Sequence, residues 1–441
     1  MLNLLPFIGS YLAFFRDPIS FFNKIFLEQG DVAIADFGIL GKLFFIFHPD
    51  DIEQFFALGK RCHRKRLNKL FGNGLFTLET GEAASNQRKS VQECFSMNHL
   101  KSILSLVETS AQHFFHEHSR ASTGIDVIQP IKTFTRKLQL ALVFGKLCTE
   151  DECELLYHLE IILDRLNREF SILIKIPDNW PNPANRAFQK SLEFLKRYIE
   201  QKVLLTQSSA VGQESFGVLS TLAAIKNASA MQTLSNETIR AEALTLLIAG
   251  TETTSALIVW MLHLLSTSPD TLSKVKIELQ QVSMTQNIQL NDLSRLSLNK
   301  QVVQETLRLY PVAWAIIRSL DSPLKTKNFE ILSGSNVWAV PWITHRHPEC
   351  WRNPIQFLPS RFEDPHGKMS KYAFFPFGEG GHRCVAQRFV MVVAQTVLAV
   401  LSREYCLETT SKEVLVPQAG LALMPMKSPR IIFRKGEYAT V

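Results

Sequence analysis

Phe377-Gly378-Glu379-Gly380-Gly381-His382-Arg383-Cys384 is the most informative stretch of this 441-residue chain. Three glycines within four residues let the backbone turn tightly and approach a flat ligand closely. One thiol follows, and residues 387–395 then read as an apolar helix. A cysteine just ahead of a helix N-terminus faces unpaired N–H groups and a positive dipole end, which favour the thiolate. The stretch therefore indicates an activated thiolate beside a flat ligand.

A thiolate in such a loop is the axial ligand that pushes electron density onto haem iron and favours O–O cleavage. Taken alone, Cys384 is more often a small buried hydrophobe, and a glycine cluster is more often a plain turn. The whole string resembles the cysteine-ligand loop of the cytochrome P450 family, Phe-Gly-x-Gly-x-(Arg or His)-x-Cys-x-Gly. It departs at Ala386, where the family usually has glycine, and it matches at Phe377, Gly378, Gly380, His382 and Cys384.

Composition and periodicity predict a mainly α protein with a small β-rich portion. The chain is 46% hydrophobic and 20% charged, which is an ordinary globular balance. No linker or internal repeat divides it, so we expect one domain over residues 1–441, β-rich at about 25–60 and 320–345. Periodicity predicts strands at 32–37, 43–47, 329–340 and 413–416, and helices at 100–116, 150–166, 188–205 and 237–265. The resemblance implies a haem sandwiched between helix 237–265 and the helix after Cys384.

Cysteines and the N-terminus bear on the compartment. The seven cysteines are odd in number and lack zinc-type spacing, which predicts a reducing compartment without disulfides. The apolar run at residues 1–15 is too short to span a bilayer and is broken by Pro6 and Gly9. We therefore expect a soluble, cytoplasmic protein without a transmembrane anchor; peripheral membrane contact stays open.

Helix 237–265 has an unusual centre, Ala249-Gly250-Thr251-Glu252-Thr253-Thr254-Ser255. Glycine and hydroxyl residues are poor choices in a helix interior, and a buried helix should not carry Glu252 without a reason. A surface helix with one polar patch, or two helices joined at Gly250, are the plainer interpretations. The segment resembles the family's oxygen-activation motif, (Ala/Gly)-Gly-x-(Asp/Glu)-Thr-(Thr/Ser). The resemblance implies that Thr253 helps to hold dioxygen at the haem and that Glu252 supplies protons.

Two further motifs concern support of the haem. Glu305 and Arg308 lie at i and i+3, a spacing that alone is common and weak. They resemble the family's Glu-x-x-Arg, and Pro359-Ser-Arg361-Phe resembles its Pro-x-Arg-Phe, which implies a buried structural triad closed by Arg361. The resemblance implies propionate partners at His382, Arg318 and Arg88, although Ala84 stands where the family's tryptophan is usual. It also places haem b (iron protoporphyrin IX) against Phe377, Gly378, Gly380 and Ala249.

By the same resemblance, the substrate pocket has an apolar lining in which Glu252 is the only charged group. We therefore expect a lipophilic substrate of fatty acyl, terpenoid or steroid-like class, into which the enzyme, a monooxygenase, inserts one atom of O2. The expected pocket residues are Phe71, Leu75, Phe76, Ile248, Ala249, Val312, Trp314, Ile316 and Leu421.

Electrons must come from a separate protein, because the sequence has no flavin or ferredoxin domain and no dinucleotide fingerprint. We expect a ferredoxin or flavodoxin-type donor with its reductase. The net charge is +7, and the basic run at residues 60–66, with Lys89, Arg383 and Arg388, forms a candidate docking face; a solvated face is the plainer alternative. No nucleic-acid motif accompanies the run, so no nucleic-acid partner is expected.

Two other functions stay open. A peroxide-driven haem-thiolate oxygenase would share Cys384 but usually lacks the acid–alcohol pair of Glu252 and Thr253. A non-catalytic haem sensor would need neither a proton relay nor a donor surface, and no output domain is visible in the sequence.

Overall fold

The computed structural model describes residues 5–38, 41–58, 70–78, 81–145, 147–171, 182–208, 217–228, 234–282, 287–327, 329–363, 370–410 and 413–436. Helices make up most of this part of the chain, and four small sheets accompany them. The basic run at residues 60–66 lies outside the described residues.

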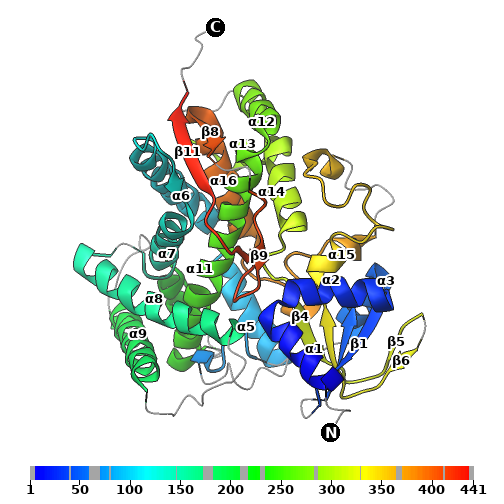
Figure 1. Cartoon of the computed structure of the whole chain (residues 1–441). Coiled ribbons are helices and arrows are strands. Elements are labelled where there is room, and N and C mark those ends of the chain that lie inside the picture. The colour runs from blue at the N-terminus through cyan, green and yellow to red at the C-terminus, as the bar shows by residue number, and fades with distance from the viewer. Residues whose placement is uncertain are drawn as a thin grey trace.

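The long helix α11, Asn236–Ser266, runs through the middle of the helical part (Figure 1). It begins where Ser235 Oγ accepts the Thr238 N–H at 3.0 Å, which is a standard N-cap. Most of its residues are buried on every side, as expected for the core helix of a large protein. In the described part of the chain it is the one helix long and apolar enough to cross a membrane, and 83% of its apolar window is buried inside the protein.

The other long helices pack around α11 or on its neighbours. Helix α7, Ile128–Phe144, α9, Pro183–Ser208, and α14, Ser297–Leu309, lie against α11, while α16, Gln387–Glu404, packs on α6, Met97–His118. Helix α8, Thr149–Ser171, packs on α9. The remaining helices are α1 Leu5–Arg16, α2 Pro18–Gln29, α3 Pro49–Leu58, α5 Glu82–Glu93, α10 Val218–Ala228, α12 Pro269–Gln281, α13 Leu290–Arg295 and α15 Pro341–Thr344.

The largest sheet has four strands in the order β1-β2-β7-β4 and lies to one side of the helical part (Figure 1). Its strands are β1 Val32–Asp36, β2 Lys42–Ile46, β7 Asn336–Ala339 and β4 Ile316–Ser319. Strands β1 and β2 form an antiparallel hairpin, whereas β2 pairs with β7 in parallel, with Leu43 opposite Asn336. Helices α1 and α2 cover it through a core rich in aromatic rings, among them Phe14, Phe22, Phe45 and Trp338.

Three smaller sheets complete the β structure. The strand β11, Arg430–Lys435, pairs with β8, Tyr405–Thr409, and with β3, Ile125–Asp126. The other two are hairpin-like pairs, β5 Leu324–Lys325 with β6 Glu330–Ile331, and β9 Pro417–Gln418 with β10 Met424–Pro425.

The predicted mainly α fold is confirmed, and so are the four helices and the strands at 32–37 and 43–47, within a few residues at their ends. The β-rich segment expected at about 25–60 is wrong at both ends. Residues 25–29 are the last part of helix α2, and Pro49 with the acidic first turn of Asp50 and Asp51 starts helix α3. The strand expected at 413–416 is also wrong: these residues form no ladder, and β9 begins at Pro417.

Candidate active site

The loop that ends at Cys384 is closed by its own backbone. The Cys384 N–H donates to the Phe377 carbonyl at 2.8 Å. Between them Gly378 and Gly380 adopt φ of 65° and 72°, a left-handed conformation that glycine enters without cost. Ala386, the N-cap of α16, has φ −92°, which any residue tolerates. The backbone at this position therefore does not require the glycine that the family usually has.

The Cys384 sulfur lies in a desolvated place that is flanked by positive charge. Burial raises the pKa of the thiol, while the backbone N–H of Ala386 and the guanidinium groups of Arg88 and Arg383 lower it. Burial is the largest of these effects, and the Ala386 N–H and the two guanidinium groups oppose it. A metal ion on the sulfur displaces this proton, because a coordinating thiol is deprotonated outright. One soft thiol with an N–H and two arginines around it fits a thiolate-bound haem iron.

The three predicted propionate partners converge on the same short stretch, residues 379–383. Arg88, on α5, donates to the carbonyls of Gly381 and Arg383. Arg318, on β4, is 3% exposed and donates to the Glu379 carbonyl at 3.1 Å. Its guanidinium lies over the rings of Phe55 and Phe56, 5.3 and 4.9 Å from their centroids. His382 belongs to the stretch itself, in the 3-10 turn η5, Gly380–His382.

In the unusual centre of α11, three residues are not fully buried. Ala249, Gly250 and Thr253 are partly exposed, whereas Thr251 and Glu252 are buried. Helix α11 continues without a break through these residues, so Gly250 does not join two separate helices. The Thr253 hydroxyl donates to the Ala249 carbonyl at 2.8 Å, one turn back along the helix. A cofactor that covered the side of α11 carrying Ala249 and Thr253 would meet a small residue and a hydroxyl.

Gly250 leaves space for a side chain from another helix. A Cβ atom at Gly250 would lie 2.6–2.9 Å from the amide group of Gln139, which projects from α7. Contacts that short do not occur in real proteins, so Gln139 or the helix would have to move. Glycine at this position is therefore explained by packing between α7 and α11.

Glu252 points into the protein and has two partners from neighbouring helices. Its Oε2 lies 3.0 Å from Nζ of Lys132 on α7, and the two side chains are only 2% and 13% exposed. The same oxygen accepts a hydrogen bond from Asn167 Nδ2, on α8, at 3.1 Å. Asn167 Oδ1 in turn accepts the Leu421 N–H at 3.1 Å. Sequence reasoning missed Lys132 and Asn167, because no local pattern marks either residue.

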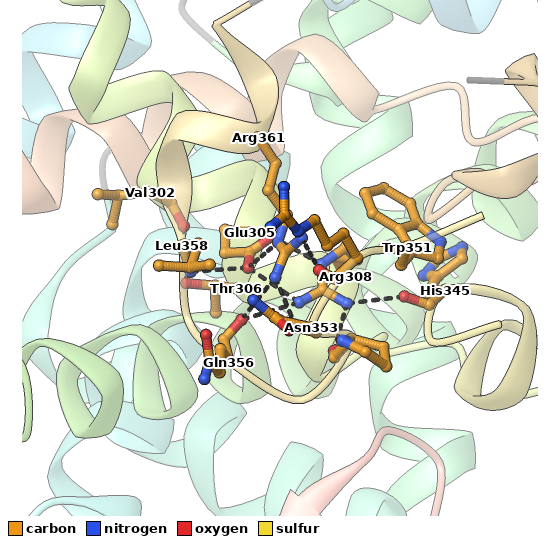
Figure 2. Close-up of polar contacts among 12 residues, drawn as sticks. Val302, Glu305, Thr306, Arg308, His345, Trp351, Asn353, Gln356, Leu358 and Arg361 are labelled. Atoms are coloured by element: carbon orange, nitrogen blue, oxygen red, sulfur yellow. Dashed lines mark hydrogen bonds and ion pairs between the residues drawn. The ribbon is translucent and has the colours of Figure 1, made fainter. Parts of the chain in front are cut away.

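Glu305, Arg308 and Arg361 come together as a buried ion-pair cluster (Figure 2). Arg308 binds Glu305 through two hydrogen bonds, from Nε at 2.7 Å and from Nη2 at 2.9 Å. Arg361 Nε lies 3.2 Å from Glu305 Oε1, which also accepts the Leu358 N–H at 2.9 Å. The remaining donors of Arg308 bind the carbonyls of His345, Pro354 and Gln356. The cluster thus joins α14 to residues 352–362.

A buried histidine extends this cluster toward the cysteine loop. His345, whose carbonyl binds Arg308, accepts the Phe375 N–H on its Nε2 at 3.1 Å. Burial, helped by Arg346 and Arg308, lowers the pKa of His345 well below its ordinary value, which keeps the ring neutral and able to accept. Phe375 lies two residues before Phe377, so the ion-pair cluster is linked to the start of the loop.

The expected pocket residues fall in three places. Phe71, Ile248 and Val312 are buried in the main helical core, and Leu75, Phe76 and Leu421 pack against it. Ile316 lies beside the cysteine loop, where its Cδ1 is 3.6 Å from the position of a Cβ on Gly378. Trp314 instead packs in the core of the four-stranded sheet, and its indole N–H donates to the Gly420 carbonyl at 2.9 Å.

Comparison with known proteins agrees with this geometry. The family model described as Cytochrome P450 matches residues 2–433. Cyclooctatin synthase of Streptomyces melanosporofaciens is 24% identical, over 95% of this chain and 92% of that protein. Cyclooctat-9-en-7-ol 5-monooxygenase of the same organism is 23% identical, over 90% and 86%. The 11-oxo-beta-amyrin 30-oxidase of Glycyrrhiza uralensis is 27% identical, over 88% and 78%.

A solved structure shows the same fold. The haem domain of a cytochrome P450DA mutant superposes with a TM-score of 0.84 at 20% sequence identity, over 95% of this chain and 94% of that one. The family match spans nearly the whole chain, and relatives along most of its length are named as a monooxygenase and an oxidase. The chain therefore belongs to the cytochrome P450 family, and it is a haem-thiolate monooxygenase that uses haem b.

Proposed function

We propose that this chain, as a single domain over residues 1–441, inserts one oxygen atom from O2 into a lipophilic substrate, with Cys384 as the axial ligand of the haem iron. The observation that carries the proposal is the geometry of the Cys384 loop: the Cys384 N–H closes on the Phe377 carbonyl at 2.8 Å, and Arg88 donates to the carbonyls of Gly381 and Arg383 beside the thiol. When bound, the haem supplies the redox chemistry that activates oxygen. The protein's part is to hold it, to exclude water and to deliver protons.

Arg88, Arg318 and His382 are proposed to bind the haem propionates, and Phe377, Gly378, Gly380 and Ala249 to border the haem. Haem carries two carboxylates, which need cations at its edge. Arg88 and Arg318 already donate to backbone carbonyls of residues 379–383, so both are held beside the cysteine loop. Glycines at 378 and 380 let the backbone approach a flat ligand closely.

Thr253 and Glu252 are proposed to move protons to the reacting oxygen. The Thr253 hydroxyl donates to Ala249, which leaves its lone pairs able to accept a hydrogen bond on the partly exposed face. Lys132 and Asn167 both bind Oε2 of Glu252. Its Oε1 is buried without a hydrogen-bond partner among the described residues, which leaves Oε1 as the oxygen that can accept a further hydrogen bond in a proton relay.

The proposed substrate is a fatty acyl, terpenoid or steroid-like molecule. Support comes from the apolar character of the predicted pocket residues Phe71, Phe76, Ile248, Val312 and Leu421, which belong to the main helical core or pack against it. Relatives of this chain are named for cyclooctat-9-en-7-ol and for 11-oxo-beta-amyrin, and both names fit a lipophilic class of substrate.

The proposed electron donor is a ferredoxin or flavodoxin-type protein with its own reductase. Lys89, Arg383 and Arg388 are exposed, and Arg383 is next to Cys384. An acidic donor that docks there would be steered by charge, and its reduction rate would fall with rising salt. The proposed compartment is reducing and cytoplasmic.

The carbon monoxide difference spectrum of the reduced protein tests the Cys384 ligand. We expect the strongly red-shifted Soret band of a thiolate-ligated haem. Cys384→Ser should move this band to the position of a neutral-ligand haem or abolish haem binding. Cys406→Ser is the matched control, since this partly exposed cysteine lies on β8, and it should keep the wild-type spectrum. A wild-type spectrum in the Cys384 variant would overturn the proposal.

Thr253→Ala separates monooxygenase chemistry from the two other functions. A monooxygenase that lacks this hydroxyl should still consume electrons but release them as hydrogen peroxide, so product formed per electron pair falls. Thr251→Ala is the control, because its buried hydroxyl donates to the Leu247 carbonyl away from the exposed face. Electron consumption and peroxide release that are equally low in wild type and in Thr253→Ala, without product from either, would favour a sensor. Full turnover with peroxide and without a donor would favour a peroxide-driven oxygenase.

A further inference from the structure

Glu242 is a buried acid on α11 that the mechanism above does not use. It is 1% exposed and lies three helical turns before Thr253. Its Oε1 accepts the Leu75 N–H at 2.7 Å and a hydrogen bond from Gln87 Nε2, on α5, at 2.5 Å. No lysine or arginine among the described residues pairs with it. A buried carboxyl held by two donors on one oxygen has a specific local role that needs an explanation.

The segment that Glu242 binds, residues 70–78, lies tightly on α11. A Cβ atom on Gly74 would be 2.5 Å from Thr245 Oγ1 and 3.1 Å from the Ala241 carbonyl, so glycine is needed for this close approach. Thr77 Oγ1 donates to the Gly72 carbonyl at 2.6 Å and closes the segment on itself. Residues 70–78 are therefore shaped to fit the surface of α11.

Gln87 ties the same segment to α5. Its Nε2 donates both to Glu242 Oε1 and to the Asn73 carbonyl at 2.9 Å. The next residue, Arg88, donates to the carbonyls of Gly381 and Arg383 in the cysteine loop. One turn of α5 thus contacts residues 70–78 on one side and the cysteine loop on the other.

We propose that Glu242 and Gln87 form a clasp that holds residues 70–78 closed over the substrate, so that Glu242 is a positioning residue for substrate entry and release. The assignment of residues 70–78 to the substrate rests on the proposed function, whereas the clasp itself rests only on the contacts above. Residues 70–78 carry three of the expected pocket side chains, Phe71, Leu75 and Phe76. Release of Leu75 N–H would free the middle of the segment.

Variants can separate the clasp from simple stability. Glu242→Gln keeps an oxygen that accepts both hydrogen bonds, whereas Glu242→Ala leaves the Leu75 N–H without this acceptor and leaves the Gln87 amide bound only to the Asn73 carbonyl. Losing one such bond makes opening of a segment about tenfold more frequent. Glu237→Ala, at an exposed acid in the first turn of the same helix, is the matched control.

Hydrogen–deuterium exchange on the haem-loaded protein tests the clasp. In Glu242→Ala, amide exchange in residues 70–78 should rise by about tenfold or more, while exchange in α14 and α16 stays unchanged. Glu242→Gln and Glu237→Ala should remain near wild type. Unchanged exchange in residues 70–78 of the alanine variant, or an equal rise throughout α14 and α16, would overturn the clasp.

Stopped-flow binding of 4-phenylimidazole, a lipophilic azole followed by the haem absorbance, tests its role at the substrate. Association and dissociation should both be about tenfold faster in Glu242→Ala and restored in Glu242→Gln. If Glu242→Ala showed faster amide exchange in residues 70–78 but bound and released the azole at wild-type rates, the proposed control of substrate entry would be overturned. A wild-type protein that gives no haem response at all would refute the proposed function, while the exchange result would still decide the clasp.

Discussion

Lys132 is the residue that makes an acid in the middle of α11 tolerable. Glu252 is 2% exposed, and Lys132 Nζ is 3.0 Å from its Oε2. Lys132→Met would leave a buried carboxylate without a cation, and breaking a buried pair in this way costs about 3–5 kcal/mol. Urea unfolding should show a loss of that size. The control is Lys137→Met on the same helix, whose pair with Glu152 is largely exposed; its loss should stay below about 1 kcal/mol. Equal losses would contradict the argument.

Gly250 and Gln139 should behave as a coupled pair. Gly250→Ala puts a Cβ into the place of the Gln139 amide, and forcing extra atoms into a packed interior typically costs about 1–3 kcal/mol. In the double variant with Gln139→Ala the new methyl group has space, so most of that loss should be recovered. A double-mutant cycle by thermal unfolding measures the coupling. If the losses of stability in the two single variants simply add in the double variant, Gln139 is not the reason that residue 250 is glycine.

Helix α14 is held to residues 352–362 by the Glu305 ion-pair cluster, which also reaches the cysteine loop through His345. Glu305→Gln keeps the shape but leaves Arg308, 0% exposed, without its counter-charge, so we expect a loss of about 3–5 kcal/mol and weaker haem retention. Unfolding and the haem content of the purified protein measure the two effects. Lys427→Ala, in an exposed pair with Glu413, should leave both nearly unchanged. A stable, haem-replete Glu305→Gln protein would refute this role.

Helices of this chain could be predicted from sequence far better than its sheets. The start of α11 is readable because Ser235 caps it and an unbroken apolar run follows. The strand predicted at 413–416 is wrong because Val414 and Val416 have side chains typical of a strand but are 85% and 54% exposed, and β9 begins only at Pro417. Pairing of β2 with β7 joins segments far apart in the chain, which no local pattern encodes.

In the candidate site, too, residues in local motifs could be predicted from sequence, whereas residues that act through distant contacts could not. Cys384, Thr253 and Glu305 lie in short contiguous motifs that can be recognised in the sequence. Lys132 and Asn167 contact Glu252 from two other helices. The role of Glu242 depends on residues 70–78, which pack on it. Residues whose role depends on tertiary contacts alone leave no signature in the sequence, because any helix surface can carry a lysine, an asparagine or a glutamate.

Stability of the protein as a whole should depend on pH through its buried acids. Burial raises the pKa of Glu242 to about 7 and that of Asp51 to about 6. The folded state therefore keeps protons that the unfolded chain releases, so both groups reduce stability as pH rises from about 4 through these values. Burial lowers the pKa of His345, so the folded protein binds fewer protons at this residue than the unfolded chain does. His345 therefore reduces stability as the pH falls below the ordinary histidine pKa of 6.5.

A difference measurement isolates Glu242. Relative to wild type, Glu242→Gln should gain roughly 2 kcal/mol of unfolding free energy between pH 5 and pH 7.5, because glutamine does not ionise. Urea titrations at the two pH values measure it. Asp51→Asn should show a similar trend with its midpoint about one pH unit lower. A pH-independent difference for Glu242→Gln would mean that this acid is not protonated in the folded protein near neutral pH.

The parallel pairing of β2 with β7 affects how this protein folds during its synthesis on the ribosome. Leu43 and its neighbours leave the exit tunnel early, but their partner strand begins at Asn336. At about 5–20 residues per second, synthesis takes on the order of 15–60 s to cover the roughly 290 residues between them. During that interval the nascent hairpin exposes an unpaired edge together with Phe44 and Phe45. The aromatic start of this chain is thus a natural client for a chaperone that binds during translation.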